Sequence, residues 1–145
     1  SGWSDGPVTL SSPPEMIGYM AELGVERTLW KPGASRLELT LTGDHLNKGG
    51  VAHGGIHMML LDSALGSALV ASLKVEEWCA TAQLSTSFLA AARPGERLVA
   101  EGRVVRRGKN VAHLAGEVKV GERLVASATG TWAIWSSRPP SLSKD

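Results

Sequence analysis

Asp62 is a lone carboxylate in a strongly apolar part of the sequence. Its neighbours include Met58, Leu61 and Leu65. Burial of an ionised carboxylate among such side chains costs several kcal/mol unless the charge is paired. The residue is therefore either a structural acid bonded to the backbone or to a neighbouring strand, or a reactive group in a site.

The run His53-Gly54-Gly55 stands where a long apolar helix is expected to begin. The first N–H groups of a helix have no intrahelical acceptor and carry partial positive charge. Glycine lets a ligand approach these groups closely. Such a helix start can hold the oxyanion formed when a thioester carbonyl is attacked. A glycine-rich turn packed against a strand is the alternative interpretation.

Other polar side chains in this region have weaker patterns. Asn47 can donate an amide hydrogen bond to a carbonyl, or can simply belong to a turn. His53 and His57 have the spacing of two zinc ligands but lack the adjacent glutamate of the metalloprotease motif, so we expect no metal. We interpret His57 as an interior histidine. Ser63 and Ser67 have no partners that would form a catalytic triad.

Hydrophobic periodicity predicts the elements that position these residues. We expect one short helix from Pro13 to Leu23, ended by Gly24, and one long helix from about His53 to Leu73, with a glycine-rich loop at 43–52 before it. The other elements read as strands over 25–30, 36–42, 80–92, 96–106, 111–120 and 124–135.

These elements predict an α+β fold in which an antiparallel sheet of five to six strands wraps one long central helix. The turns between the later strands are short, as in a meander. A helix that is apolar on most sides must be covered on most sides. The edge strands of such a sheet also need protection, and a partner subunit can supply it.

Length and composition indicate one domain of ordinary globular type. The chain has 145 residues, 43% hydrophobic and 20% charged, with a formal net charge of +1. This balance favours neither nucleic acid nor membrane as a partner. Cys79 is the only cysteine, which excludes an intrachain disulfide and fits a reducing, cytoplasmic setting. The N-terminal residues do not resemble a signal peptide. We expect a flexible arm at 1–12, the domain at 13–136 and a polar tail at 137–145.

The region from Asn47 to Gly66 resembles a known family motif. The hotdog-fold acyl-CoA thioesterases of the phenylacetate-degradation (PaaI-like) type have Asn, a glycine, then His-Gly-Gly, and an acid nine residues after the histidine. The matching residues here are Asn47, Gly50, His53-Gly54-Gly55 and Asp62, followed by Ala64 and Gly66. The order of later elements also fits, so the resemblance covers roughly residues 15–135 and implies the hotdog fold.

The resemblance also implies roles for individual residues. Asp62 would be the carboxylate that attacks the thioester or activates water, and the Gly54 N–H would be the oxyanion donor. Asn47 and His53 would orient the carbonyl or the water. Many family members place Ser or Thr about nineteen residues after the acid to hold that water, and Thr81 stands at this offset. Its alternative role is that of a β-branched strand residue.

The acyl pocket and the binding site for coenzyme A (CoA) are expected near this motif. Met58, Met59, Leu61 and Phe88 are candidates for the pocket walls, and Gly55 allows close approach of the substrate at the helix start.

A basic turn would hold the CoA phosphates, as in relatives that bind them there. It contains Arg106, Arg107 and Lys109, and residues 93–119 hold seven basic and three acidic side chains, a local net of +4. Arginine suits phosphate recognition. The alternative is a solvated hairpin tip.

The expected function is therefore hydrolysis of an acyl-CoA, aryl or medium-chain, without a cofactor. A non-catalytic acyl-CoA-binding module on the same fold is the alternative, although a pure binder has no need of Asp62. A hotdog dehydratase would need a different His/acid arrangement, which the sequence lacks.

Helix geometry predicts a homo-oligomer. Nine residues along a helix separate His53 and Asp62 by about 13 Å and by a half-turn, so one carbonyl cannot contact both in one chain. We expect a dimer with composite sites, alone or paired again into a tetramer.

Overall fold

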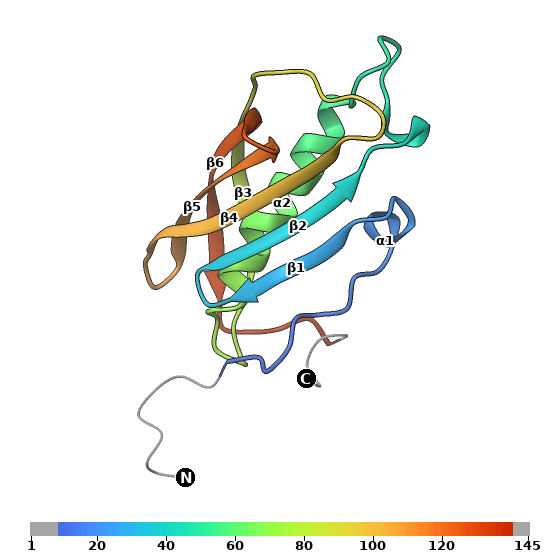
Figure 1. Ribbon diagram of the computed structural model, residues 1–145. Helices are drawn as coiled ribbons and strands as arrows, with labels where there is room; N and C mark the ends of the chain where they lie inside the picture. Colours follow the sequence, from blue (N-terminus) through green and yellow to red (C-terminus); the bar gives the residue numbers. More distant parts are fainter. Residues whose placement is uncertain (1–8, 141–145) are drawn as a thin grey trace.

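One long helix lies against one face of a six-stranded antiparallel sheet in the computed structural model, which describes residues 9–140 (Figure 1). The helix is α2 (Gly54–Val70). The sheet has the order β1-β2-β4-β5-β6-β3. Its strands are β1 (Glu26–Lys31), β2 (Ala34–Thr40), β3 (Trp78–Phe88), β4 (Arg97–Arg107), β5 (Val111–Val120) and β6 (Arg123–Trp135).

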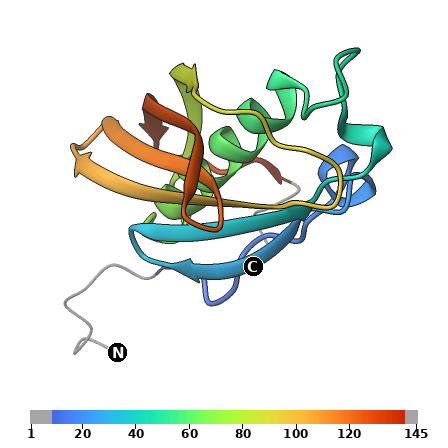
Figure 2. The same cartoon turned by 45° about the horizontal axis from the view of Figure 1, so that its top comes forward.

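The sheet curves around the helix, and this confirms the predicted α+β hotdog architecture (Figure 2). Strands β4, β5 and β6 form the meander, while β3, which follows the helix in the chain, pairs only with β6. β1 and β3 are thus the two edge strands among the described residues. The placement of β3 beside the last strand brings its side chains next to α2.

Close contact between α2 and the centre of the sheet fixes the helix position. The Ser35 hydroxyl on β2 donates to the Ala64 carbonyl oxygen over 2.5 Å. A Cβ added to Gly102 on β4 would lie 2.5 Å from the same oxygen, so only glycine fits there. Leu60 and Leu65 are fully buried at this contact. The helix therefore packs on the sheet backbone with little freedom to slide.

One stripe of α2 is not covered by the sheet. Gly55, Met58, Asp62 and Gly66, spaced three or four residues apart, are exposed or half-buried, while most other positions of the helix are buried. Residues at this spacing share one face of a helix. Thus the helix is less completely covered within one chain than its composition suggests, and Asp62 lies on the open face.

The short N-terminal helix is much shorter than predicted. The sequence suggested a helix from Pro13 to Leu23, but α1 comprises only Tyr19–Glu22. Gly18, with φ of +70°, interrupts any earlier helical turn, and Pro14 can donate no backbone hydrogen bond. Gly24, with φ of +90°, follows the helix as expected. Residues 13–17 instead form an irregular strap across one end of α2.

Other boundaries moved by a few residues. α2 ends at Val70 rather than Leu73, because Ser72 and Leu73 donate to the carbonyls three residues earlier in tight turns. β3 begins at Trp78 and ends at Phe88, so the segment predicted as its end, 89–92, is a loop. A short 3-10 helix, η1 (Gly43–His45), lies in the predicted loop.

The terminal segments pack more closely than an arm and a tail would. Residues 1–8 and 141–145 lie outside the described part of the chain. Thr9 bridges to Lys74, and Leu10 is buried in the core, so these two residues of the predicted arm pack against the domain. Arg138 of the predicted tail lies over the Trp78 ring, 5.4 Å from its centroid. In residues 9–140, no helix is long and apolar enough to cross a bilayer.

Candidate active site

The N-terminus of α2 presents an unpaired backbone donor. His53 is the N-cap, and its Nδ1 accepts from the Gly55 N–H at 2.9 Å. The Ile56 N–H donates to the His53 carbonyl. Within the described residues, no acceptor takes the Gly54 N–H. This donor lies at the positive end of the helix dipole and can stabilise a negative oxygen.

Asn47 is a turn residue and also a possible donor, so both interpretations of the sequence describe it. Its Oδ1 accepts from the N–H groups of Gly49 (2.8 Å) and Val51 (3.4 Å). These bonds fix the orientation of the amide. Its Nδ2 has no acceptor in the part of the chain that the structure describes, and the residue is exposed. Asn47 can therefore offer an oriented N–H to a ligand.

The buried His45 anchors the loop that carries Asn47, a role that the sequence did not suggest. Its Nδ1 accepts from the Thr42 N–H at 2.9 Å, and its Nε2 lies 2.9 Å from the Leu23 carbonyl oxygen. This pattern requires the neutral ring with the proton on Nε2. The His45 carbonyl in turn accepts from the His53 N–H at 2.9 Å. His45 thus connects the loop to the start of α2.

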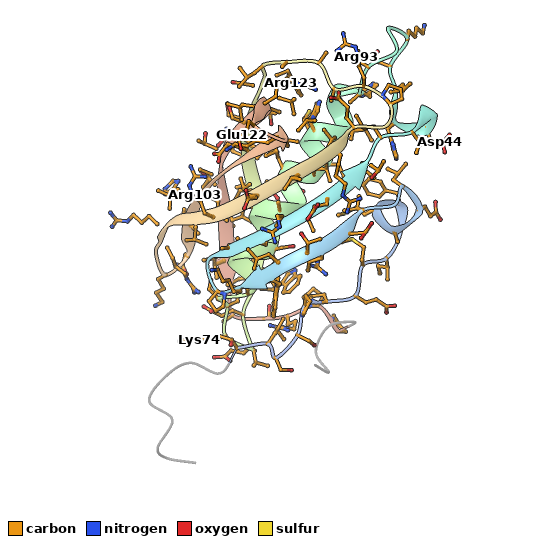
Figure 3. The ribbon with its side chains drawn as sticks, in the orientation of Figure 1. Asp44, Lys74, Arg93, Arg103, Glu122 and Arg123 are labelled. Carbon is orange, nitrogen blue, oxygen red and sulfur yellow. The ribbon has the colours of Figure 1, made fainter. Side chains whose placement is uncertain are left out.

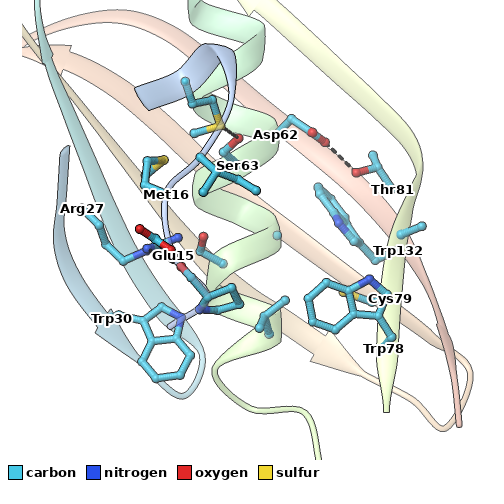
Figure 4. A pocket seen from close by; sticks show the side chains of 17 residues that line it. Glu15, Met16, Arg27, Trp30, Asp62, Ser63, Trp78, Cys79, Thr81 and Trp132 are labelled. Atoms are coloured by element: carbon cyan, nitrogen blue, oxygen red, sulfur yellow. Dashed lines mark hydrogen bonds between the residues drawn. The ribbon is translucent and has the colours of Figure 1, made fainter. Parts of the chain in front are cut away.

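Asp62 and Thr81 form a hydrogen-bonded pair at the open face of α2 (Figure 4). The Thr81 hydroxyl donates to Asp62 Oδ1 at 2.6 Å. Asp62 is half-buried. Leu61 and Leu65 are buried in the core, whereas Met58 shares the open face with Asp62, and Thr81 is the partner that β3 supplies. The second carboxylate oxygen, Oδ2, has no partner among the described residues.

A cavity of about 310 Å³ begins at this pair and extends toward β1. The α2 side chains Asp62, Ser63 and Ser67 form one wall, and the strap with Met16 closes another. The far wall comes from Arg27 and Trp30 (Figure 4), and β3 and β6 supply Trp78, Cys79 and Trp132. Burial raises the pKa of the Cys79 thiol to about 12; the charge of Arg107 opposes this rise and that of Asp62 adds to it, so this lining thiol is protonated at neutral pH.

The acyl walls predicted from the sequence are elsewhere. Met59 and Leu61 are buried in the core and do not line this cavity. Met58 and Phe88 are exposed and do not line the cavity. Phe88 instead covers the helix start, where a Cβ on Gly54 would lie 3.4 Å from its ring.

His57 is an interior histidine, as its sequence context suggested. It is buried beside Phe88, with ring centroids 6.2 Å apart, and burial lowers its pKa. Its Nδ1 has no acceptor in residues 9–140. No three His, Cys, Asp or Glu side chains of these residues gather closely enough to hold a metal ion.

The basic turn divides into paired and unpaired residues. Arg107 donates to Glu77 at 2.8 Å and is partly buried, and its role in phosphate binding stays a prediction. Burial raises the Glu77 pKa, but hydrogen bonds from Lys74 and Arg107 hold it below its usual value. Arg106 and Lys109 are exposed and make no ion pair within the described residues. These two are therefore the more accessible candidates for phosphate contact.

Most other arginines of the sheet are also paired on its outer surface. Arg103 contacts Glu117 at 2.9 Å and Arg123 contacts Glu96 at 2.7 Å (Figure 3). Both glutamates are already counted in the local net of +4, so these two pairs do not reduce the excess of positive charge that the sequence suggested. Exposed pairs of this kind contribute little to stability, roughly 0–1 kcal/mol each.

The two halves of the predicted site are separated within one chain. α2 runs without interruption from Gly54 to Asp62, and eight residues of helix span about 12 Å. The outer edge of β3, eleven residues long, has no strand partner among the described residues. The donors at the helix start and the Asp62–Thr81 pair cannot serve one carbonyl without a second chain.

The fold and this arrangement define a hotdog-fold protein with a carboxylate on its central helix. Comparison with family models identifies the family: the chain belongs to the thioesterase superfamily, whose model matches residues 49–127. That range contains His53, Gly54, Asp62 and Thr81, while Asn47 lies two residues before it.

Individual relatives agree with this assignment. A Deinococcus radiodurans protein named "Putative esterase" is 38% identical over 75% of this chain and 72% of its own length. The phenylacetic acid degradation protein PaaI of Thermus thermophilus, solved as a mutant, superposes with a TM-score of 0.75 at 27% identity, covering 79% of this chain and 96% of its own. The Streptococcus mutans protein smu.793, solved bound to acetyl CoA, has a TM-score of 0.73 at 24% identity, over 80% and 92% of the two chains.

Proposed function

We propose that the protein hydrolyses acyl-CoA thioesters to the free acid and CoA, at composite sites formed by two copies of the chain. The observation that carries this proposal is the Asp62–Thr81 pair at the opening of a cavity. Membership of the thioesterase superfamily gives the reaction class. The Streptococcus mutans neighbour with bound acetyl CoA supports CoA esters as the substrates. The unpaired thiol of Cys79 fits a reducing compartment, and we place the protein in the cytoplasm.

The proposed chemistry divides the site between the two chains. The thioester carbonyl oxygen accepts hydrogen bonds from the Gly54 N–H and from Asn47 Nδ2 of one chain, which stabilise the charge that develops on that oxygen. Asp62 of the other chain either attacks the carbonyl carbon or takes a proton from an attacking water. In both routes the C–S bond breaks and CoA leaves as the thiolate. Thr81 holds the carboxylate, or the water beside it.

The free edge of β3 supports this dimer. An unpaired strand edge exposes a row of N–H and C=O groups that readily bind a second strand. Pairing of β3 with its symmetry copy would also bring the open stripe of α2 toward the partner. The Asp62 of one chain would then face the helix start of the other. Two such dimers can pair again into a tetramer.

Phosphate contact is proposed for Arg106 and Lys109, with Gly55, Met58 and Phe88 beside the reacting ester. The two basic side chains are exposed and free of carboxylate partners in the described residues. CoA carries several phosphate charges, and such contacts lie far from the reacting carbonyl. They should therefore affect substrate binding more than turnover.

Refolding of mixed chains tests the composite site. Asp62→Asn and Asn47→Ala chains, each assayed alone for thiol release, should be nearly inactive. In a mixed dimer one site inherits both substitutions and the other neither. Random pairing makes half the dimers mixed, so activity should return to roughly a quarter of wild type. Absence of recovery, with mixed dimers shown by mass spectrometry, would place the site within one chain.

Asp62→Asn alone separates an enzyme from a non-catalytic binder. The amide keeps the size of the side chain but cannot attack carbon or accept a proton at neutral pH. We expect thiol release to be abolished and acyl-CoA affinity to stay within a few-fold of wild type. If the wild-type protein binds acyl-CoA without releasing thiol, the binding-module alternative holds instead.

A single turnover in heavy-oxygen water distinguishes the two routes of the proposed reaction. Label in the protein carboxylate indicates attack by Asp62, since water then cleaves the acyl-enzyme anhydride. Label found only in the product acid is expected when Asp62 acts as a general base, and also when water cleaves the anhydride at the acyl carbonyl, so only label in the protein is decisive.

A further inference from the structure

A bulge in β1 places Arg27 and Trp30 on the wall of the cavity beside Asp62. The pairing of β1 with β2 shifts by one residue between Arg27 and Leu29. Arg27 lies opposite Leu37 and Trp30 opposite Ser35, and both of these β2 residues are buried under the helix. In a regular strand, residues three apart face opposite sides of the sheet. The bulge therefore places Arg27 and Trp30 on the same inner face.

Each side chain has one buried donor that no described residue satisfies. Arg27 Nη1 donates to the Pro14 carbonyl at 3.1 Å, but its Nε is buried without an acceptor in residues 9–140. Trp30 Nε1 is also buried without an acceptor there. Arg27 forms no ion pair with any described carboxylate. Glu15 lines the same cavity but is exposed and remains unpaired with Arg27.

A purely structural role does not account for these two donors. An unsatisfied buried donor costs roughly 1–3 kcal/mol, and more when it is charged. Arg107, a partly buried arginine outside the cavity wall, is paired with Glu77, whereas Arg138 over Trp78 also has an Nε without an acceptor in residues 9–140. In addition, the strap residues that contact Arg27 offer it one carbonyl only. Donors left unpaired on a cavity wall are the usual means by which a site recognises a polar group of its ligand.

We propose that the β1 end of the cavity binds an oxygen acceptor at the far end of the acyl group, so that the protein prefers acyl-CoAs whose acyl chain ends in a carboxylate over those ending in a methyl. The thioester would lie at Asp62, with the chain running along α2 past Met16 and Ser67 toward β1 (Figure 4). A carboxylate there would pair with the Arg27 guanidinium, with Trp30 as a second donor on the same wall. The positive charge of Arg27 favours a carboxylate over a hydroxyl.

Matched pairs of substrates test this preference, which rests on the proposed function for its kinetic readout. The pairs are glutaryl-CoA with pentanoyl-CoA, adipyl-CoA with hexanoyl-CoA, and suberyl-CoA with octanoyl-CoA, and 6-hydroxyhexanoyl-CoA reports on a neutral acceptor. A charged hydrogen bond contributes enough to change kcat/KM by roughly tenfold or more. We therefore expect at least one carboxylate-ended ester to exceed its methyl-ended partner by about that factor. Equal kcat/KM within every pair would overturn the proposal.

Two variants and one control locate the effect. Arg27→Met keeps the length of the apolar stem and should abolish the preference for carboxylate-ended esters. Trp30→Phe keeps an aromatic ring, removes only the Nε1–H, and should reduce the preference in part. Arg36→Met removes an arginine on β2 that pairs with Glu38 outside the cavity, and should leave the ratio unchanged. If the preference survives in both Arg27→Met and Trp30→Phe, other residues cause it and the proposal is overturned.

Binding to Asp62→Asn protein separates this proposal from the proposed function. Calorimetric titration with adipyl-CoA and hexanoyl-CoA compares affinities without hydrolysis. Tighter binding of adipyl-CoA, lost in the Asp62→Asn/Arg27→Met protein, supports the polar end of the cavity even if the wild-type protein releases no thiol. Equal affinities, together with normal thiol release by the wild type, would reject the polar end and leave the hydrolase intact.

Discussion

The position of the two-fold axis in the proposed dimer follows from contacts within one chain. Asp62 lies beside Thr81, and Gly54 lies beside Phe88. A composite site that joins Asp62 to the partner's Gly54 therefore requires Thr81 opposite the partner's Phe88. β3 carries a bulge between residues 81 and 83, where two residues oppose one. The two bulged residues are counted as one position. Antiparallel pairing inward from this contact then places Ser85 opposite Ser85 of the partner subunit.

Ser85→Cys in a Cys79→Ala background tests this axis. Directly opposed residues of antiparallel strands have Cα atoms about 4.5–5.5 Å apart, within the roughly 4.4–6.8 Å that a disulfide spans. Mild oxidation should therefore link the two chains in high yield, as measured by non-reducing electrophoresis and mass spectrometry.

The control is Ser87→Cys in the same background. Its residue would oppose position 83 of the partner, so the two cysteines would be separated by four residues of strand, about 13 Å, and should not link. A linked Ser87→Cys dimer, or a Ser85→Cys protein that is dimeric but never links, would refute this register and the composite site built on it.

The remaining predictions concern substrate binding, pH and packing. Arg106→Ala with Lys109→Ala should raise KM for CoA esters and affect acyl-pantetheine esters much less; equal effects would exclude phosphate contact. Burial lowers the His57 pKa, so the unfolded chain binds more protons in acid, and stability should fall as pH drops below about 6.5 toward the folded-state pKa. His57→Leu should flatten this dependence of the melting temperature, whereas the exposed His113→Gln should not. Gly102→Val should lower the free energy of unfolding by about 1–3 kcal/mol or more in urea titrations, because its side chain would collide with the backbone of α2.

Much of the fold could be predicted because its signals are local. Alternation of polar and apolar residues located five of the six strands to within two or three residues at each end. The long helix was predicted from its apolar length and from the glycines at its start. The short helix was overestimated, since the pattern from Met16 to Leu23 is compatible with a helix, while Gly18 prevents one at its beginning. The positive φ of Gly18 therefore accounts for the difference between the predicted and the observed length of this helix.

Only the site residues that belong to the sequence motif, or stand at a fixed offset from it, were predictable. The motif led to Asp62, and a fixed offset led to Thr81, which the structure places 2.6 Å away. The pairing of Arg107 with Glu77 was not visible, because thirty residues separate them and the contact depends on the folded loop. Arg27 was missed for a similar reason. Its inward orientation depends on a bulge in β1, and the alternation of polar and apolar residues in the sequence does not reveal that bulge.

The sheet order also sets the timing of folding during synthesis. β3 carries Thr81, and its only described partner within the chain is β6, the last strand to be made. From Phe88 to Trp135 there are 47 residues, which a ribosome adds in about 2–9 s at roughly 5–20 residues per second. During that interval neither edge of β3 is paired, and the apolar helix α2 lacks the strands that follow β3 in the chain. A nascent chain stalled before β6 would therefore present its helix and β3 to other chains, and chaperone binding should concentrate at that stage.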